Sequence, residues 1–133
     1  MKTDVSAKVL VDTSVWIAYF RKQEPQFGRL TELIDQDRVA CCGVILAELM
    51  QGAKSARELK MLKDFLAVFE FPGEATSLWV AAGELSYSLR KSGSAAGLAD
   101  CYLAALALEN GYTVMSLDKH FDEIATTAGL RLL

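Results

Sequence analysis

Short apolar runs alternate with longer stretches of helical periodicity along this chain. Val9, Leu10 and Val11 form an apolar run that ends at an acid, which is typical of a strand buried in a parallel sheet. Further strands are predicted at Val39 to Cys42, Val68 to Phe71, Thr113 to Leu117 and Leu130 to Leu133. Strands that alternate with helices predict an α/β fold, with helices on both faces of a mostly parallel sheet.

The helical stretches are recognised by apolar residues three or four positions apart and by the residues at their ends. Ser14 is predicted to cap the first helix, which carries Trp16, Ile17 and Phe20. Gly52 and Gly111 end two later helices, because glycine readily adopts the left-handed conformation that follows a helix. The later helices are predicted at Phe27 to Gln36, Val44 to Gln51, Ser55 to Leu66, Ala75 to Arg90, Leu98 to Asn110 and Phe121 to Ala128.

Length and composition predict one domain, residues 1–133, with enough apolar residues for a core. The chain has 133 residues, of which 52% are hydrophobic, and no internal repeat or linker is visible. Fourteen Lys and Arg against 17 Asp and Glu give a net charge of -3, which argues against a polycation that coats nucleic acid. A local basic patch for RNA is still compatible, and its candidates are Arg21, Lys22, Lys54, Arg90, Lys91 and Lys119.

Few residues suit a zinc site or a disulfide framework. The chain has three cysteines, no Cys-x-x-Cys spacing and one histidine, His120, for which packing, capping or a phosphate contact are the expected roles. The cysteines are therefore predicted to be small buried hydrophobes in a reducing compartment. The segment Met1 to Lys8 is polar and Asp12 breaks the following apolar run, so we expect neither a signal peptide nor a membrane span, and a cytoplasmic protein.

Four acids stand in apolar surroundings. Three of them, Asp12, Glu48 and Asp100, have no Lys or Arg nearby in the sequence. Asp12 and Asp118 each end a predicted strand, Glu48 lies inside an apolar helix, and Asp100 is the one charged residue between Leu98 and Leu108. A buried carboxylate is costly unless it is paired or binds a cation. Ligand sites of parallel sheets lie beyond the carboxyl ends of the strands, and an all-oxygen ligand set favours Mg²⁺ or Mn²⁺.

Each acid also has a purely structural alternative. Asp12 can cap the first helix and Asp118 can be a turn residue or helix cap. Glu48 can be exposed on a surface helix, and Asp100 can interact with the dipole at the start of its helix. Glu70 and Glu84 have apolar neighbours too, but both are explained by outward, solvent-exposed positions.

The spacing of these acids resembles the PIN-domain ribonucleases and, within them, the VapC toxins of bacterial toxin–antitoxin pairs. Four segments carry the resemblance in order along nearly the whole chain. They are Val9 to Trp16, Ala47 to Gly52, Leu98 to Ala105 and Ser116 to Ile124. One departure is Cys101-Tyr102, where an aliphatic pair is usual after the third acid.

The resemblance implies a PIN-like three-layer α/β/α sandwich and a metal-dependent endoribonuclease. Asp12, Glu48 and Asp100 would bind Mg²⁺, with Mn²⁺ as a substitute, directly or through water, and Asp118 would bind a second metal or orient water. Ser116 would complete the catalytic set by hydrogen bonding to ligands or to the nucleophilic water. The substrate implied is RNA, with tRNA favoured, and its cleavage would inhibit translation.

The same resemblance implies a VapB-like antitoxin and a homodimer. Trp16 and Phe20 lie four residues apart on one helical stripe, which fits either core packing or a groove for an antitoxin helix. Other functions remain as alternatives. They are a non-catalytic PIN-fold module that binds RNA or protein, a haloacid-dehalogenase-like phosphatase, which would want an acid where Ser14 stands, and a receiver-type signalling domain.

Overall fold

A three-stranded parallel sheet organises the fold. The structure, a computed structural model, describes residues 7–133, so most of the Met1 to Lys8 segment lies outside the described residues. The strand order is β2-β1-β3, with β1 at Val9–Val11, β2 at Val39–Ala40 and β3 at Thr113–Met115. The predicted α/β class with a parallel sheet is therefore confirmed.

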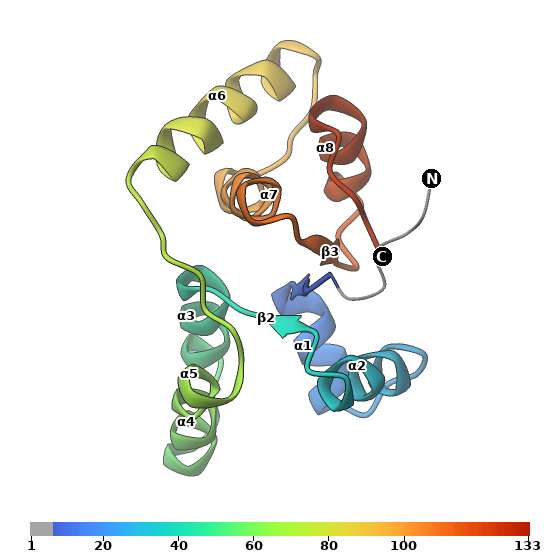
Figure 1. Cartoon of the computed structure of the whole chain (residues 1–133), viewed down its shortest axis with the longest axis vertical. Coiled ribbons are helices and arrows are strands. Elements are labelled where there is room, and N and C mark those ends of the chain that lie inside the picture. Colours follow the sequence, from blue (N-terminus) through green and yellow to red (C-terminus); the bar gives the residue numbers. More distant parts are fainter. Residues whose placement is uncertain (1–6) are drawn as a thin grey trace.

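Helices cover both sides of this sheet, as the alternating pattern predicted. Figure 1 shows α6, α7 and α8 on one side of the sheet, α1 and α2 on the other, and α3 to α5 beside β2. Their bounds are α1 Thr13–Phe20, α2 Gln26–Asp35, α3 Gly43–Gln51, α4 Ala56–Lys63, α5 Phe65–Val68, α6 Ser77–Lys91, α7 Leu98–Asn110 and α8 His120–Ala128. None of the helices in the described part of the chain has the length and apolar character to cross a bilayer.

The most apolar elements of the sequence form the centre of the molecule. All three residues of β1 are buried, and so is α7 from Cys101 to Ala107. Helix α7 ends at Gly111, whose φ of 69° is the left-handed conformation predicted for that glycine. Helix α7 is buried over most of its length. Asp100 lies in its first turn, whereas its other carboxylate, Glu109, is exposed in the last turn.

Two predicted strands are wrong. The Val68 to Phe71 stretch continues from the short helix α5, and only Glu70 forms an isolated bridge, with Ala40 of β2. The Leu130 to Leu133 stretch likewise forms one bridge, between Leu132 and Val114. Both stretches lie at the edges of the sheet, and residues 131–133 are exposed, so little apolar burial is available to extend the pairing.

Smaller differences concern element ends. The predicted helix Ser55 to Leu66 divides at Asp64 into α4 and α5, while the strands at Val39 and Thr113 are shorter than predicted by two residues each. The prediction that Ser14 caps the first helix is also wrong, since α1 begins at Thr13 and Asp12 occupies the N-cap position.

The cysteines are buried hydrophobes, as predicted. Cys41, Cys42 and Cys101 are free and buried. Burial raises the pKa of the Cys42 thiol to about 11, with the nearby Glu74 carboxylate contributing to the shift. A thiol that stays protonated at neutral pH is a poor nucleophile, so Cys42 does not compete with the acids as candidate chemistry.

Candidate active site

Asp12 lies at the carboxyl end of the central strand and is the best-buried acid of the site. Its backbone N–H donates to Met115 O at 2.9 Å, which joins the ends of β1 and β3. Its side chain makes no cap hydrogen bond to α1, although it stands at the N-cap position. Instead, Oδ2 accepts hydrogen bonds from Ser14 at 3.0 Å and from Ser116 at 2.7 Å. Two hydroxyls therefore hold this carboxylate in place, and helix capping does not explain it.

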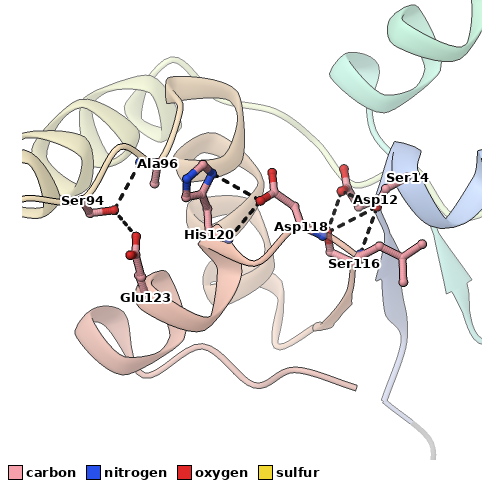
Figure 2. A network of polar contacts seen from close by, with 9 residues as sticks. Asp12, Ser14, Ser94, Ala96, Ser116, Asp118, His120 and Glu123 are labelled. Atoms are coloured by element: carbon pink, nitrogen blue, oxygen red, sulfur yellow. Dashed lines mark hydrogen bonds and ion pairs between the residues drawn. The ribbon is translucent and has the colours of Figure 1, made fainter.

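Ser116 connects Asp12 to the loop that carries Asp118. The hydroxyl of Ser116 donates to Asp12 and accepts from the backbone N–H of Asp118 at 3.0 Å, while Ser14 Oγ accepts from Leu117 N at 3.0 Å. Figure 2 shows this chain of contacts running from Asp12 through Ser116 to Asp118. The β3–α8 loop is thus tied to the start of α1 by side-chain oxygens.

Asp118 and His120 form a second pair in the same loop. Asp118 Oδ1 accepts from the backbone N–H of His120 at 2.9 Å and lies 3.3 Å from His120 Nδ1. The hydrogen bond from the His120 N–H closes a turn ahead of α8. Asp118 therefore does act as a turn residue, which was the structural alternative for it. Both side chains are only half-buried, so they also remain open to a ligand.

Asp100, in the first turn of α7, faces these carboxylates across the site. Its pKa is raised to about 7, first by burial and then by repulsion from Asp118 and Asp12. A side-chain hydrogen bond with Asp118 acts in the same direction, and His120 opposes it. Burial together with neighbouring carboxylates thus makes the charged form of Asp100 costly, and such a raised pKa is common at functional sites.

The structure thus gathers three of the predicted acids and adds a residue that sequence reasoning missed. One ligand atom from each of Asp100, Asp118 and His120 lies within 4.8 Å of the others, and Asp12 is close enough to affect Asp100. The sequence contained a partial clue to His120, because a turn-forming Asp binds the backbone N–H two residues on and thereby brings that residue close to the acid. His120 was instead assigned to packing, capping or phosphate contact.

Glu48 stands apart from this group. It is exposed on α3, and its Oε1 accepts a hydrogen bond from Thr13 Oγ1 at 2.8 Å. Thr13 directly follows Asp12, so Glu48 reaches the site through the start of α1. Glu48 is therefore exposed, as the structural alternative for this residue predicted. Its role as a metal ligand stays a prediction.

The prediction that all four acids lie in apolar surroundings holds fully only for Asp12. Its exposure is 7%, whereas Asp100 and Asp118 are half-buried and Glu48 is exposed. Among residues 7–133 no Lys or Arg forms an ion pair with these acids, and the ion pairs there are Lys8 with Asp37 and His120 with Asp118. Uncompensated oxygen donors of this kind suit a hard divalent cation.

Carboxylates from separate segments that converge at the carboxyl edge of a parallel sheet define a class of α/β domain with an acidic, cation-binding site. Residues 9–126 match the PIN domain family, and the chain belongs to that family. The phosphatase and receiver-type alternatives are thereby removed, because they belong to other folds. A non-catalytic module on the PIN fold remains as the alternative to an enzyme.

Relatives of similar length align along nearly the whole chain. VapC ribonuclease Mb1587 from Mycobacterium bovis is 29% identical over 129 residues, which are 92% of this chain and 96% of that protein. Ribonuclease VapC1 from Methanocaldococcus jannaschii is 29% identical over 119 residues, covering 89% and 82% of the two chains. The structure of DNA-bound VapBC from Salmonella typhimurium superposes with a TM-score of 0.76 at 25% identity, over 96% of this chain and 97% of that chain. The predicted three-layer PIN fold is therefore confirmed.

Proposed function

We propose that this chain is a metal-dependent endoribonuclease that hydrolyses RNA phosphodiester bonds. The observation that carries the proposal is the convergence of Asp12, Asp100 and Asp118 with no Lys or Arg to neutralise them among residues 7–133. The names of the relatives, which are ribonucleases, favour RNA over other phosphodiesters. On the whole-chain match to these relatives we also propose that the chain is a single PIN domain.

The donor set fits Mg²⁺, with Mn²⁺ as a substitute. Asp12, Asp100 and Asp118 would hold the ion, and Glu48 would contribute directly or through water. The ion supplies Lewis acidity towards the scissile phosphate and the attacking water. Asp12 is prepared for this role, because Ser14 and Ser116 both bind Oδ2 and fix the direction of the carboxylate. We assign Ser116 to holding the acids in place, since its two contacts join Asp12 to Asp118.

Binding of an RNA strand requires positive charge near the acids. All six basic candidates from the sequence are exposed, and none of them forms an ion pair within the part of the chain that the structure describes. Lys119 directly follows Asp118, so it is the best placed of the six to meet a phosphate beside the site. We propose tRNA as the substrate, with inhibition of translation as the result, on the family resemblance alone.

A cleavage assay with the purified chain tests the proposal. With Mg²⁺ or Mn²⁺ we expect RNA cleavage that stops in EDTA, returns on adding the ion back, and is absent in Asp100→Asn. The matched control is Glu84→Gln, which neutralises an exposed acid on α6. Activity in Asp100→Asn at the parent rate contradicts the site assignment, and a folded parent without turnover supports the non-catalytic alternative. Growth arrest on expression tests the toxin role separately.

The partner that we propose is a VapB-like antitoxin docked on α1. Trp16 is buried against Phe65, with ring centroids 4.8 Å apart, so the core-packing interpretation is correct for Trp16. Ile17 and Phe20, however, are 41% and 40% exposed and lie three residues apart on one stripe of the helix. This apolar stripe suits an amphipathic helix, and similar solved structures are VapBC complexes.

A second copy of the chain is the other partner that we propose. Helix α6, which lies on the other side of the sheet from α1 in Figure 1, carries three large exposed apolar side chains, Trp79, Val80 and Tyr87. Apolar residues grouped on one exposed helix favour a protein interface. We therefore propose a homodimer, and a chain of this kind would act in the cytoplasm, where RNA and antitoxin are present.

Phe20→Glu tests the antitoxin surface. A charge in the centre of an apolar contact is expected to weaken the complex by about 100-fold, because the carboxylate would be desolvated without a partner. The measurement is co-purification with a VapB-like protein encoded beside the gene, with Leu108→Glu, an exposed position on α7, as the control. Cleavage should be unchanged in both variants. Co-purification of Phe20→Glu at the parent level contradicts the assignment.

A further inference from the structure

The segment between α5 and α6 contacts both α3 and α7, the helices that carry the proposed metal ligands Glu48 and Asp100. In Figure 1 it runs from α5 past α3 to the start of α6. Glu74 in this segment accepts a hydrogen bond from the phenol of Tyr102 on α7. Its other oxygen accepts from the backbone N–H of Gly43, the first residue of α3, at 3.1 Å. One carboxylate thus joins α3 to α7.

At the α7 end, the contact fixes the rotation of the helix about its own axis. Tyr102 is 1% exposed, and its ring stacks on Trp79 with centroids 4.1 Å apart. Burial raises the pKa of the phenol, so it remains a proton donor to Glu74. Residues two apart on a helix point to nearly opposite sides, because each residue advances the helix by about 100°. Holding Tyr102 at Glu74 therefore directs Asp100 towards the acid site.

At the α3 end, the contact replaces a missing helix cap. Cys42 occupies the N-cap position of α3 and makes no side-chain cap hydrogen bond. Glu74 supplies the acceptor instead, and a carboxylate at this end also interacts favourably with the helix dipole. Glu48 lies on the same helix, five residues after Gly43. The position of Glu48 thus depends on where Glu74 holds the start of α3.

We propose that Glu74 is a positioning residue that holds α3 and α7 together and so sets Glu48 relative to Asp100. This inference rests on the proposed metal-dependent function. It also gives a role to Tyr102, which stands where the PIN-domain ribonucleases usually have an aliphatic residue. The link matters for Glu48 in particular, because Glu48 is exposed and its contact to the rest of the site is through Thr13.

The same segment provides a matched control. Glu70 accepts a hydrogen bond from the phenol of Tyr112, which follows α7 and is also buried. Both pairs join a tyrosine to an exposed glutamate of one segment. The Tyr112–Glu70 pair, however, has no bond from its carboxylate to α3 among the described contacts. Tyr112→Phe therefore removes a similar hydrogen bond without releasing the helix that carries Glu48.

The experiment compares Tyr102→Phe and Glu74→Gln with Tyr112→Phe and Glu70→Gln. Mn²⁺ binding to the RNA-free protein is followed by the electron paramagnetic resonance signal of free Mn²⁺, and RNA cleavage is followed at saturating Mn²⁺. For Tyr102→Phe and Glu74→Gln we expect Mn²⁺ affinity to fall by about 3- to 10-fold, with a drop of similar size in kcat. The two control variants should match the parent in Mn²⁺ affinity and kcat. Thermal unfolding in EDTA should show similar changes for both pairs.

Three results overturn the inference. The first is unchanged Mn²⁺ affinity and kcat in Tyr102→Phe and Glu74→Gln, which leaves these bonds a purely structural role. The second is an equal loss in Tyr112→Phe and Glu70→Gln, which indicates general loosening of the segment. The third is a parent that neither binds Mn²⁺ nor cleaves RNA, and this one removes the proposed function as well. A functional parent with unaffected variants removes the inference alone.

Discussion

The Asp12→Asn variant should cleave RNA about 10²- to 10³-fold more slowly than the parent while remaining folded. Asp12 is the one acid of the site that is fully buried, and its backbone joins the ends of β1 and β3. Asparagine keeps the shape and can still accept from Ser14 and Ser116 through its amide oxygen. It lacks the negative charge that a cation requires, so the loss falls on metal binding and turnover rather than on folding.

Initial rates at saturating Mg²⁺, together with thermal unfolding in EDTA, measure this effect. Stability should change by about 1 kcal/mol or less, because the variant removes a buried charge and keeps its hydrogen bonds. Asp35→Asn, which neutralises an exposed acid at the end of α2, is the control and should behave like the parent. An Asp12→Asn protein that cleaves at the parent rate would show that this carboxylate does not take part in the chemistry.

The parts of the fold that were predictable are those with a strong burial pattern and a clear end. The run Val9–Val11 and the helix Leu98–Asn110 have the predicted bounds, because the strand is wholly apolar, residues 101–107 of the helix are buried, and each element is followed by a residue that stops it. These two elements also carry Asp12 and Asp100. Two of the proposed metal ligands therefore lie on or beside elements whose bounds were predictable from the sequence.

Local pattern was insufficient at the edges of the sheet. Val68 to Phe71 is apolar enough for a strand, but Phe65 and Phe69 pack on Trp16 instead, and that preference depends on a helix more than 45 positions away. Short apolar runs have no periodicity that separates strand from helix. Leu130 to Leu133 was likewise over-predicted, because only Leu130 in that run is buried.

In the site, too, a residue that directly follows a strand was predictable, whereas contacts between residues far apart in the sequence were not. Asp12 directly follows β1, as predicted, whereas Asp118 lies in the loop three residues beyond the end of β3. Spacing alone also did not show that Glu48 is exposed or that His120 contacts Asp118. The links from Glu74 to Tyr102 and Gly43 join residues 28 and 31 positions apart. Nothing in the sequence around Glu74 distinguishes it from any other exposed acid.

The metal-free protein should become less stable as the pH rises from 5 to 8. The pKa of Asp100 in the folded chain is about 7, against an ordinary value of 3.8. Between these values the folded protein holds a proton that the unfolded chain has released, so the free energy of unfolding falls as the pH rises through this window and is level above it. The expected loss between pH 5 and pH 8 is about 1 to 2.5 kcal/mol, because the folded pKa lies about two pH units above pH 5 and the partial exposure of Asp100 to solvent reduces the effect.

Urea unfolding in EDTA at pH 5 and pH 8 measures this loss, and the Asp100→Asn variant isolates its source. Other groups of the protein also contribute to the pH dependence of its stability, so the test is the difference in slope between parent and variant. Asparagine cannot ionise, and the variant should therefore lose much less stability than the parent between the two pH values. Equal slopes in the two proteins would show that Asp100 is not the group responsible.

Adding Mg²⁺ should reverse the trend in the parent. At pH 8, above the pKa of Asp100, this carboxyl group is ionised, and a cation that binds it only in the folded state stabilises the protein by mass action. The parent should then recover most of the stability lost above pH 5, while Asp100→Asn should gain much less. Recovery in the parent alone would show that the cation relieves the repulsion between Asp100, Asp118 and Asp12. The same carboxylates would then explain both the loss of stability at high pH and the binding of the cation that the proposed reaction requires.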